Sequence, residues 1–136
     1  MEPLHIDATK STPAVHFNGD VNILELAGES YPENAAGFYG PVYNWLSRFL
    51  QDTEPRVLLV KIALLYFNSS SSKALMNLFD RFEEAVDDGW RISVDWCYHE
   101  DNDTALECGE DFREDYDSFE FNLVSLPEGS RCDESY

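Results

Sequence analysis

The central stretch of this chain reads VLLVKIALLYF at residues 57–67, NSSSS at residues 68–72 and KALMNLFDRFEEAVD at residues 73–87. The first segment is an apolar run interrupted only by Lys61, which predicts a central β-strand covered on both faces. In the third segment, apolar side chains recur at helical spacing, which predicts an amphipathic helix. A strand therefore enters a helix through a run of serines.

The two ends of this helix carry their own signals. Asn68 and the first serines are good N-cap residues, because their side-chain oxygens accept hydrogen bonds from the free N–H groups of a first turn. Gly89 favours a helix end with a left-handed residue. A hydroxyl in the first turn lies near the positive end of the helix dipole, so it tolerates a phosphate and can be switched by it. The alternative is that these serines only cap the helix.

Several side chains of the predicted helix lie away from its apolar stripe when residues are placed 100° apart. Among them, Met76 is an exposed, adaptable apolar group about two turns beyond the first serine, so it offers a small docking surface. The full set is Ser69, Ser72, Met76, Asp80, Glu83 and Asp87.

Length and composition limit the classes of protein that this chain can represent. Its 136 residues suit one domain with a single core, and a hydrophobic content of 43% argues against a disordered chain. The 27 acidic and 9 basic residues give a formal charge of −18, which repels phosphate backbones and anionic membrane surfaces. We therefore expect neither nucleic acid nor a membrane as a partner.

The sequence shows neither a secretory signal nor a membrane-spanning run. The N-terminus has no basic region followed by an apolar one, so no secretory signal is visible. The longest apolar run, near residues 56–67, is too short to span a bilayer. We expect a cytoplasmic protein.

The chain before the central stretch predicts an arm, a hairpin and a helix. Residues 1–13 are polar and contain proline, so we expect an extended arm. Residues 14–17 and 21–27 are predicted strands on either side of an Asn-Gly turn signal. A helix with Asn34 as a candidate cap then reaches about Leu50. Pro41 is either its first regular residue or the position of a kink, and we expect an irregular first turn with a regular helix from Pro41.

The chain after the central stretch predicts a strand, a helix, a strand and a tail. Residues 91–98 alternate as a strand with one wetter face. Residues 104–107 have the form of a capping box, so a short helix reaches about Phe112. Residues 119–124 alternate as a last strand, and residues 127–136 form a polar, acidic tail with no reason to be ordered.

Together these elements predict one fold class. Strands that are linked through helices become parallel neighbours by right-handed crossovers. We predict a single α/β domain over residues 14–126, with a mixed sheet of about five strands and three helices in the order ββαβαβαβ.

The sequence offers poor candidates for catalysis or metal binding. His5, His16 and His99 stand apart, and no GxSxG elbow accompanies them. The acidic segment 99–103 fails as a calcium loop, because the sixth position counted from Asp101 is Leu106, where glycine is needed. A glycine-rich phosphate loop is also missing. We therefore predict a binding module without cofactor, metal or catalytic residues.

Four motifs carry a resemblance to a known family. They are STPA at residues 11–14, GESYPEN at 28–34, LLYFNSSS at 64–71 and EDFRED at 110–115. With them the chain resembles the SiaC family of bacterial regulatory phosphoproteins over nearly its whole length. The resemblance implies a STAS-like, partner-switching protein, in which a helix-start hydroxyl is phosphorylated by a dedicated serine/threonine kinase and cleared by a PP2C-type phosphatase.

The resemblance also implies a target and a set of site residues. In this family the unmodified protein binds and activates a diguanylate cyclase, which raises cyclic di-GMP and favours biofilm or aggregate formation. Ser69 matches the family's threonine acceptor, and neighbouring Ser70 is the alternative acceptor. We expect the partner to bind around the same helix start, at Asn68, Ser70, Ser72, Lys73, Met76 and Asp80.

The sequence leaves two other functions open. The first is an anti-sigma-factor antagonist that binds an anti-sigma kinase, which the identity of the co-purifying partner would distinguish. The second is a small cytosolic enzyme that uses His99 with Asp95 or Asp101. Substitution of His99 would then abolish turnover, whereas an adaptor would keep its partner binding.

Overall fold

The structure, a computed structural model, describes residues 2–127 of the chain. Its strands and helices are β1 (Leu4–Ile6), β2 (Ala14–Asn18), β3 (Ile23–Ser30), α1 (Ala35–Asp52), β4 (Val57–Phe67), α2 (Ser69–Asp87), β5 (Arg91–His99), α3 (Asp103–Asp115) and β6 (Glu120–Leu126). The predicted mixed α/β class with three helices is confirmed, but the sheet has six strands. The tail predicted at residues 127–136 lies, apart from Pro127, outside the described residues.

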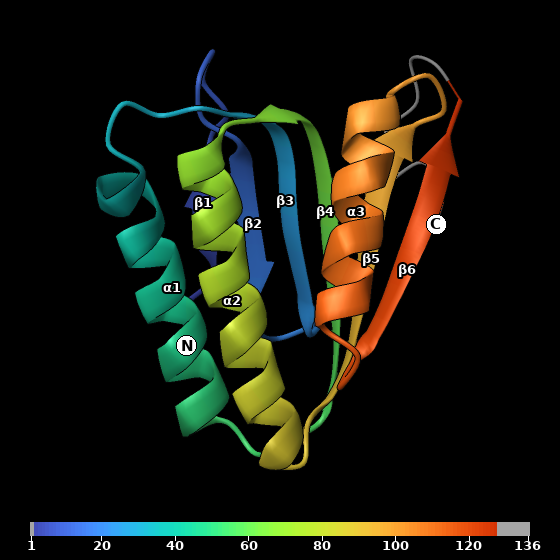
Figure 1. Cartoon of the computed structure of the whole chain (residues 1–136). Helices are drawn as coiled ribbons and strands as arrows, with labels where there is room; N and C mark the ends of the chain where they lie inside the picture. Colours follow the sequence, from blue (N-terminus) through green and yellow to red (C-terminus); the bar gives the residue numbers. More distant parts are fainter. Residues whose placement is uncertain (1, 128–136) are drawn as a thin grey trace.

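The sheet follows the order of the chain, β1-β2-β3-β4-β5-β6. The first three strands pair antiparallel, and β3 to β6 pair parallel. Each parallel step passes through one helix and advances in the same direction, so right-handed crossovers place α1, α2 and α3 on one face of the sheet (Figure 1).

The additional strand is β1, which lies within the segment predicted to be an extended arm. Leu4 and Ile6 are half-buried and pack against the core, while His5 pairs with His16 of β2. The Trp45 indole N–H also donates to the Glu2 carbonyl at 2.8 Å. The prediction failed because alternation over three residues is too short to be recognised, and the pairing depends on a partner strand further along the chain.

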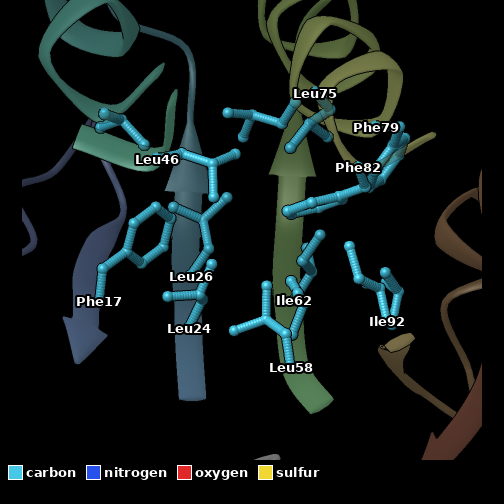
Figure 2. Close-up of a cluster of buried hydrophobic side chains, with 14 of the residues drawn as sticks. Phe17, Leu24, Leu26, Leu46, Leu58, Ile62, Leu75, Phe79, Phe82 and Ile92 are labelled. Carbon is cyan, nitrogen blue, oxygen red and sulfur yellow. The ribbon is translucent and has the colours of Figure 1, made fainter. Parts of the chain in front are cut away.

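The core fills the space between the sheet and its helices. Alternate residues of β2 to β5 point toward the helices and meet the apolar stripes of α1 and α2 (Figure 2). Figure 2 labels ten of these side chains, namely Phe17, Leu24, Leu26, Leu46, Leu58, Ile62, Leu75, Phe79, Phe82 and Ile92. All of them are buried.

The opposite face of the sheet carries no helix among residues 2–127 (Figure 1). Among the described residues, helices therefore cover β4 on one face, and its other face is partly buried. Leu59 and Ala63 point to the helix-free face and are only half-buried, although Lys61 between them is 8% exposed. The apolar composition predicted a central strand, and the sheet order confirms that position.

Helix α1 begins earlier than expected. It starts at Ala35, and the Asn34 side chain accepts a hydrogen bond from the Gly37 N–H at 3.0 Å. Pro41 therefore lies inside the helix rather than at its first position. The apolar stripe continues across the proline, with Tyr39 before it and Val42 after it both buried, and this packing outweighs the missing backbone hydrogen bond.

The remaining boundaries differ from prediction by a few residues. The β2–β3 connection spans residues 19–22 rather than a two-residue Asn-Gly turn, with Asn22 at a φ of 58°. Helix α3 is capped by Asn102, whose side chain accepts from the Ala105 N–H at 3.1 Å, and not by Thr104. The predicted end of α2 is confirmed, since Gly89 has a φ of 108°.

Candidate functional site

The candidate site is the start of α2, where β4 leaves the sheet. Asn68 is the N-cap as predicted, and its side-chain oxygen accepts from the Ser71 N–H at 3.0 Å. The Asn68 carbonyl accepts from the Ser72 N–H at 2.9 Å, and the Asn68 N–H donates to the Ser30 carbonyl at 3.1 Å. The first turn is therefore attached to the end of β3 as well as to β4.

The four serines of the run differ in exposure. Ser69 and Ser70 are exposed, Ser72 is half-buried, and Ser71 is 0% exposed. A modifying enzyme must reach the hydroxyl oxygen, so the structure leaves Ser69 and Ser70 as the accessible positions of the first turn. The run of four serines in the sequence could not predict this difference in exposure, because the difference depends on which side of α2 faces the core.

Ser71 belongs to a buried chain of hydroxyl groups. The Ser30 hydroxyl donates to the Ser71 hydroxyl at 2.7 Å, and the Tyr39 hydroxyl lies 2.5 Å from Ser30 on the other side. Burial raises the pKa of Tyr39, against the lowering effect of its hydrogen bonds with Ser30 and Ser71. The neutral phenol thus links α1, the end of β3 and the first turn of α2.

The exposed side of α2 that faces α3 contains the predicted docking residue. Met76 is 40% exposed, as the helical spacing predicts. The Tyr116 hydroxyl donates to the Asp80 carboxylate at 2.8 Å and lies 3.3 Å from the Met76 carbonyl. Burial, followed by the hydrogen bond to Asp80 and neighbouring carboxylates, raises the pKa of Tyr116. The Ser69 side of α2 is thereby fixed to the end of α3.

A groove of about 860 Å³ runs between α1 and α2. Ser70, Lys73 and Asp80 line it from α2, and Tyr43 and Glu33 lie on the opposite wall. Asp80 borders both this groove and the side of α2 that contains Ser69, Ser72 and Met76, and the other predicted partner-binding residues are divided between the two surfaces. Both surfaces begin at the N-terminal end of α2.

Two exposed apolar residues next to the site were not singled out from the sequence. Leu65 is 50% exposed and Tyr66 is 53% exposed, and the Tyr66 ring packs edge-on against Tyr31 with centroids 5.7 Å apart. They are exposed because β4 pairs with β5 only as far as Ile62, so its last residues have a neighbouring strand on one side. The apolar run alone gives no indication of where that pairing stops.

One pair proposed for an enzymatic alternative, His99 with Asp95, does not assemble. Asp95 and His99 stand four residues apart on β5, which separates their Cα atoms by about 13 Å. The Asp95 carboxylate accepts from the Asn122 amide at 3.0 Å. Within residues 2–127, no three metal-ligating side chains converge on one point, and no helix is long and apolar enough to cross a membrane.

These features define a mixed α/β protein, with three helices on one face of a six-stranded sheet and accessible hydroxyls at the start of the helix after the central strand. Comparison with known proteins identifies the family. The sequence profile described as SiaC family regulatory phosphoprotein matches residues 6–126. This chain belongs to the SiaC family.

Relatives from Pseudomonas aeruginosa agree in sequence and in structure. An uncharacterised protein of strain UCBPP-PA14 is 43% identical over 128 residues, which is 94% of this chain and all of the relative. The crystal structure of apo-SiaC is 41% identical, with a TM-score of 0.82 over 91% of this chain and 99% of that chain. A chain in the crystal structure of the diguanylate cyclase SiaD in complex with its activator SiaC is also 41% identical, with a TM-score of 0.85 over 90% and 99%.

Proposed function

We propose that this protein is a non-enzymatic, cytoplasmic regulator of a partner-switching pathway, whose unphosphorylated form binds and activates a diguanylate cyclase. The observation that carries the proposal is the similarity to a chain from the complex of a diguanylate cyclase with its activator, at a TM-score of 0.85 and 41% identity. Activation would raise cyclic di-GMP and thereby favour biofilm or aggregate formation.

Ser69 is the proposed phosphorylation site, with a cognate serine/threonine kinase and a PP2C-type phosphatase as the modifying enzymes. Its side chain is exposed at the first position of α2. Asn68 accepts a hydrogen bond from Ser71, so the N–H groups of the two preceding residues remain available to an anion at the positive end of the helix. Ser70 is the alternative acceptor, and its position in the groove distinguishes it from Ser69.

The proposed docking surface surrounds these hydroxyls. It combines Asn68, Ser70, Ser72, Lys73, Met76 and Asp80 with the exposed apolar side chains of Leu65 and Tyr66. Exposed apolar side chains that lie together offer area that a partner can cover. The serines at the edge of that area then decide whether the contact can form.

Phosphate would oppose binding for electrostatic reasons. It adds a charge of about −1.5 to −2 and three strongly hydrated oxygens. The Ser69 side of α2 already contains Asp80, and the whole chain has a formal charge of −18. A partner that covers this surface must remove water from the phosphate, which is unfavourable unless it supplies arginines.

The proposal is tested with two variants at one position. Ser69→Ala should bind the cyclase like the unmodified protein, whereas Ser69→Glu should bind at least about ten-fold more weakly, a loss of about 1.4 kcal/mol. Calorimetric titration against the purified cyclase measures the affinity, and cyclic di-GMP production measures activation. Ser70→Glu is the matched comparison, because a weaker effect there assigns the switch to Ser69.

Equal binding by Ser69→Ala and Ser69→Glu would contradict the switch. Peptide mass spectrometry after incubation with ATP and the kinase identifies the acceptor directly, and the phosphatase should remove the phosphate. If Ser69→Ala instead co-purifies with an anti-sigma kinase and not with a cyclase, the protein is an anti-sigma-factor antagonist.

A further inference from the structure

The helix-free face of the sheet carries one row of polar side chains, with one residue from each strand. Strand pairing places neighbours of this row directly opposite one another along the whole width of the sheet. In order the row is His5, His16, Glu25, Lys61, Asp95 and Asn122. None of these residues takes part in the surface around α2.

At one end of the row, two imidazole rings meet across the β1–β2 pair. His5 and His16 are directly opposed, with ring centroids 4.1 Å apart and an angle of 55° between the rings. The His16 Nε2 atom contacts the His5 Nδ1 atom. Both side chains are exposed, so the point between the two nitrogens is accessible from solvent.

A carboxylate orients one of the two rings. Asp7 Oδ1 accepts from His5 Nε2 at 2.7 Å. Because Nε2 is the donor in this contact, a neutral His5 ring has its acceptor at Nδ1, the atom that contacts His16. A carboxylate on the outer nitrogen is also the usual support of a metal-binding histidine, because it holds the ring and raises its basicity.

We propose that His5 Nδ1 and His16 Nε2 bind a divalent transition-metal ion of the Zn²⁺ class, with water at the remaining coordination positions. Imidazole nitrogens suit zinc, copper and nickel. Opposed residues of an antiparallel pair have Cβ atoms about 5 Å apart, close enough for two histidines to share one ion. In this proposal the two imidazoles are the protein's ligands, because His5 and His16 are directly opposed across the β1–β2 pair.

The charge of the surroundings favours a cation at this point. Glu25 lies opposite His16 in the next strand, on the same face of the sheet. The chain as a whole carries a formal charge of −18, which attracts positive ions. A bound ion would join β1, an edge strand of three residues that pairs with β2 alone, to the rest of the sheet.

The test is a zinc titration of the full chain, purified without a histidine tag. Calorimetry should show one zinc ion per chain in the wild type, and His16→Asn should weaken that affinity by at least about ten-fold. Asp7→Ala should weaken it by about ten-fold, because the outer support is lost. His99→Asn is the matched control, since His99 lies on β5, three strands away from β2, and should leave the affinity unchanged.

Two further measurements place the ion without any assay of activity. Imidazole nitrogen resonances of His5 and His16 should shift on zinc addition, while those of His99 should not. Hydrogen exchange of the β1 amides should slow with zinc in the wild type and not in His16→Asn. Equal zinc affinity in wild type and His16→Asn, or failure of the wild type to bind zinc, would overturn the proposal. Because both histidines are exposed, unchanged circular dichroism will separate loss of binding from loss of fold.

Discussion

Ser71 and Ser70 are chemically identical neighbours with opposite environments. Ser71 is 0% exposed and accepts a hydrogen bond from Ser30, whereas Ser70 is exposed in the groove beside α1. The buried hydroxyl chain through Tyr39 fixes the direction of the first turn of α2. It thereby determines which hydroxyls of the serine run reach solvent.

Ser71→Ala should lower the free energy of unfolding by about 1–3 kcal/mol, because the buried Ser30 hydroxyl loses its acceptor. Ser70→Ala is the control, and its effect should stay within about 0.5 kcal/mol, as for most surface substitutions. Urea denaturation followed by circular dichroism measures both variants. Equal losses in the two variants would show that the hydroxyl chain contributes nothing specific to stability.

Helix α3 lies close to the sheet at one glycine. A Cβ atom at Gly109 would lie 2.5 Å from Cδ1 and 2.7 Å from Nε1 of Trp96. The Trp96 ring is 1% exposed, and its indole N–H donates to the Ala105 carbonyl at 2.9 Å, so it has no free direction in which to move. The short distance between α3 and β5 depends on the missing side chain.

Gly109→Ala should therefore destabilise the protein by about 1–3 kcal/mol, although alanine is the better helix former. The exposed neighbour Glu110 supplies the control, since Glu110→Ala should change stability by less than about 0.5 kcal/mol. Thermal unfolding by calorimetry compares the two. A Gly109→Ala protein that is as stable as the wild type would mean that α3 can move away from Trp96 at little cost.

At the scale of the whole molecule, charge is the dominant surface property. The formal charge is −18. Among residues 2–127, the ion pairs that involve lysine or arginine are Lys61 with Glu25 at 3.9 Å and Arg81 with Glu84 at 3.5 Å. Net repulsion between carboxylates therefore exceeds the attraction within these pairs and opposes the compact state.

The melting temperature should accordingly rise with salt. Between about 0.01 M and about 1 M NaCl the screening length falls from about 30 Å to about 3 Å, so carboxylate repulsion is largely removed. A gain of about 1 kcal/mol would raise the melting temperature by roughly 3–6 °C for a domain of this size. Differential scanning calorimetry at pH 7 measures it. A melting temperature that falls with salt would mean that specific ion pairs outweigh the net repulsion.

Local periodicity was sufficient to predict most of the architecture. The apolar run of β4, the helical spacing of α2 and the alternation of β5 each describe contacts within one element, and all three were correctly assigned. The N-cap role of Asn68, the left-handed Gly89 and the exposure of Met76 follow from the same local geometry. The specific motifs around Ser69 were also sufficient to predict the SiaC family.

Other features depend on which distant segments meet, and only the tertiary structure decided them. Burial of Ser71 requires Ser30 from β3, and exposure of Tyr66 requires that β5 pair with β4 only as far as Ile62. The strand pairing that brings His5 opposite His16 joins a segment too short to be recognised alone. The sequence by itself determined most of the elements, because periodicity is a property of neighbours along the chain, and its motifs carried the resemblance to the family. Register and pairing between strands decided which side chains are accessible.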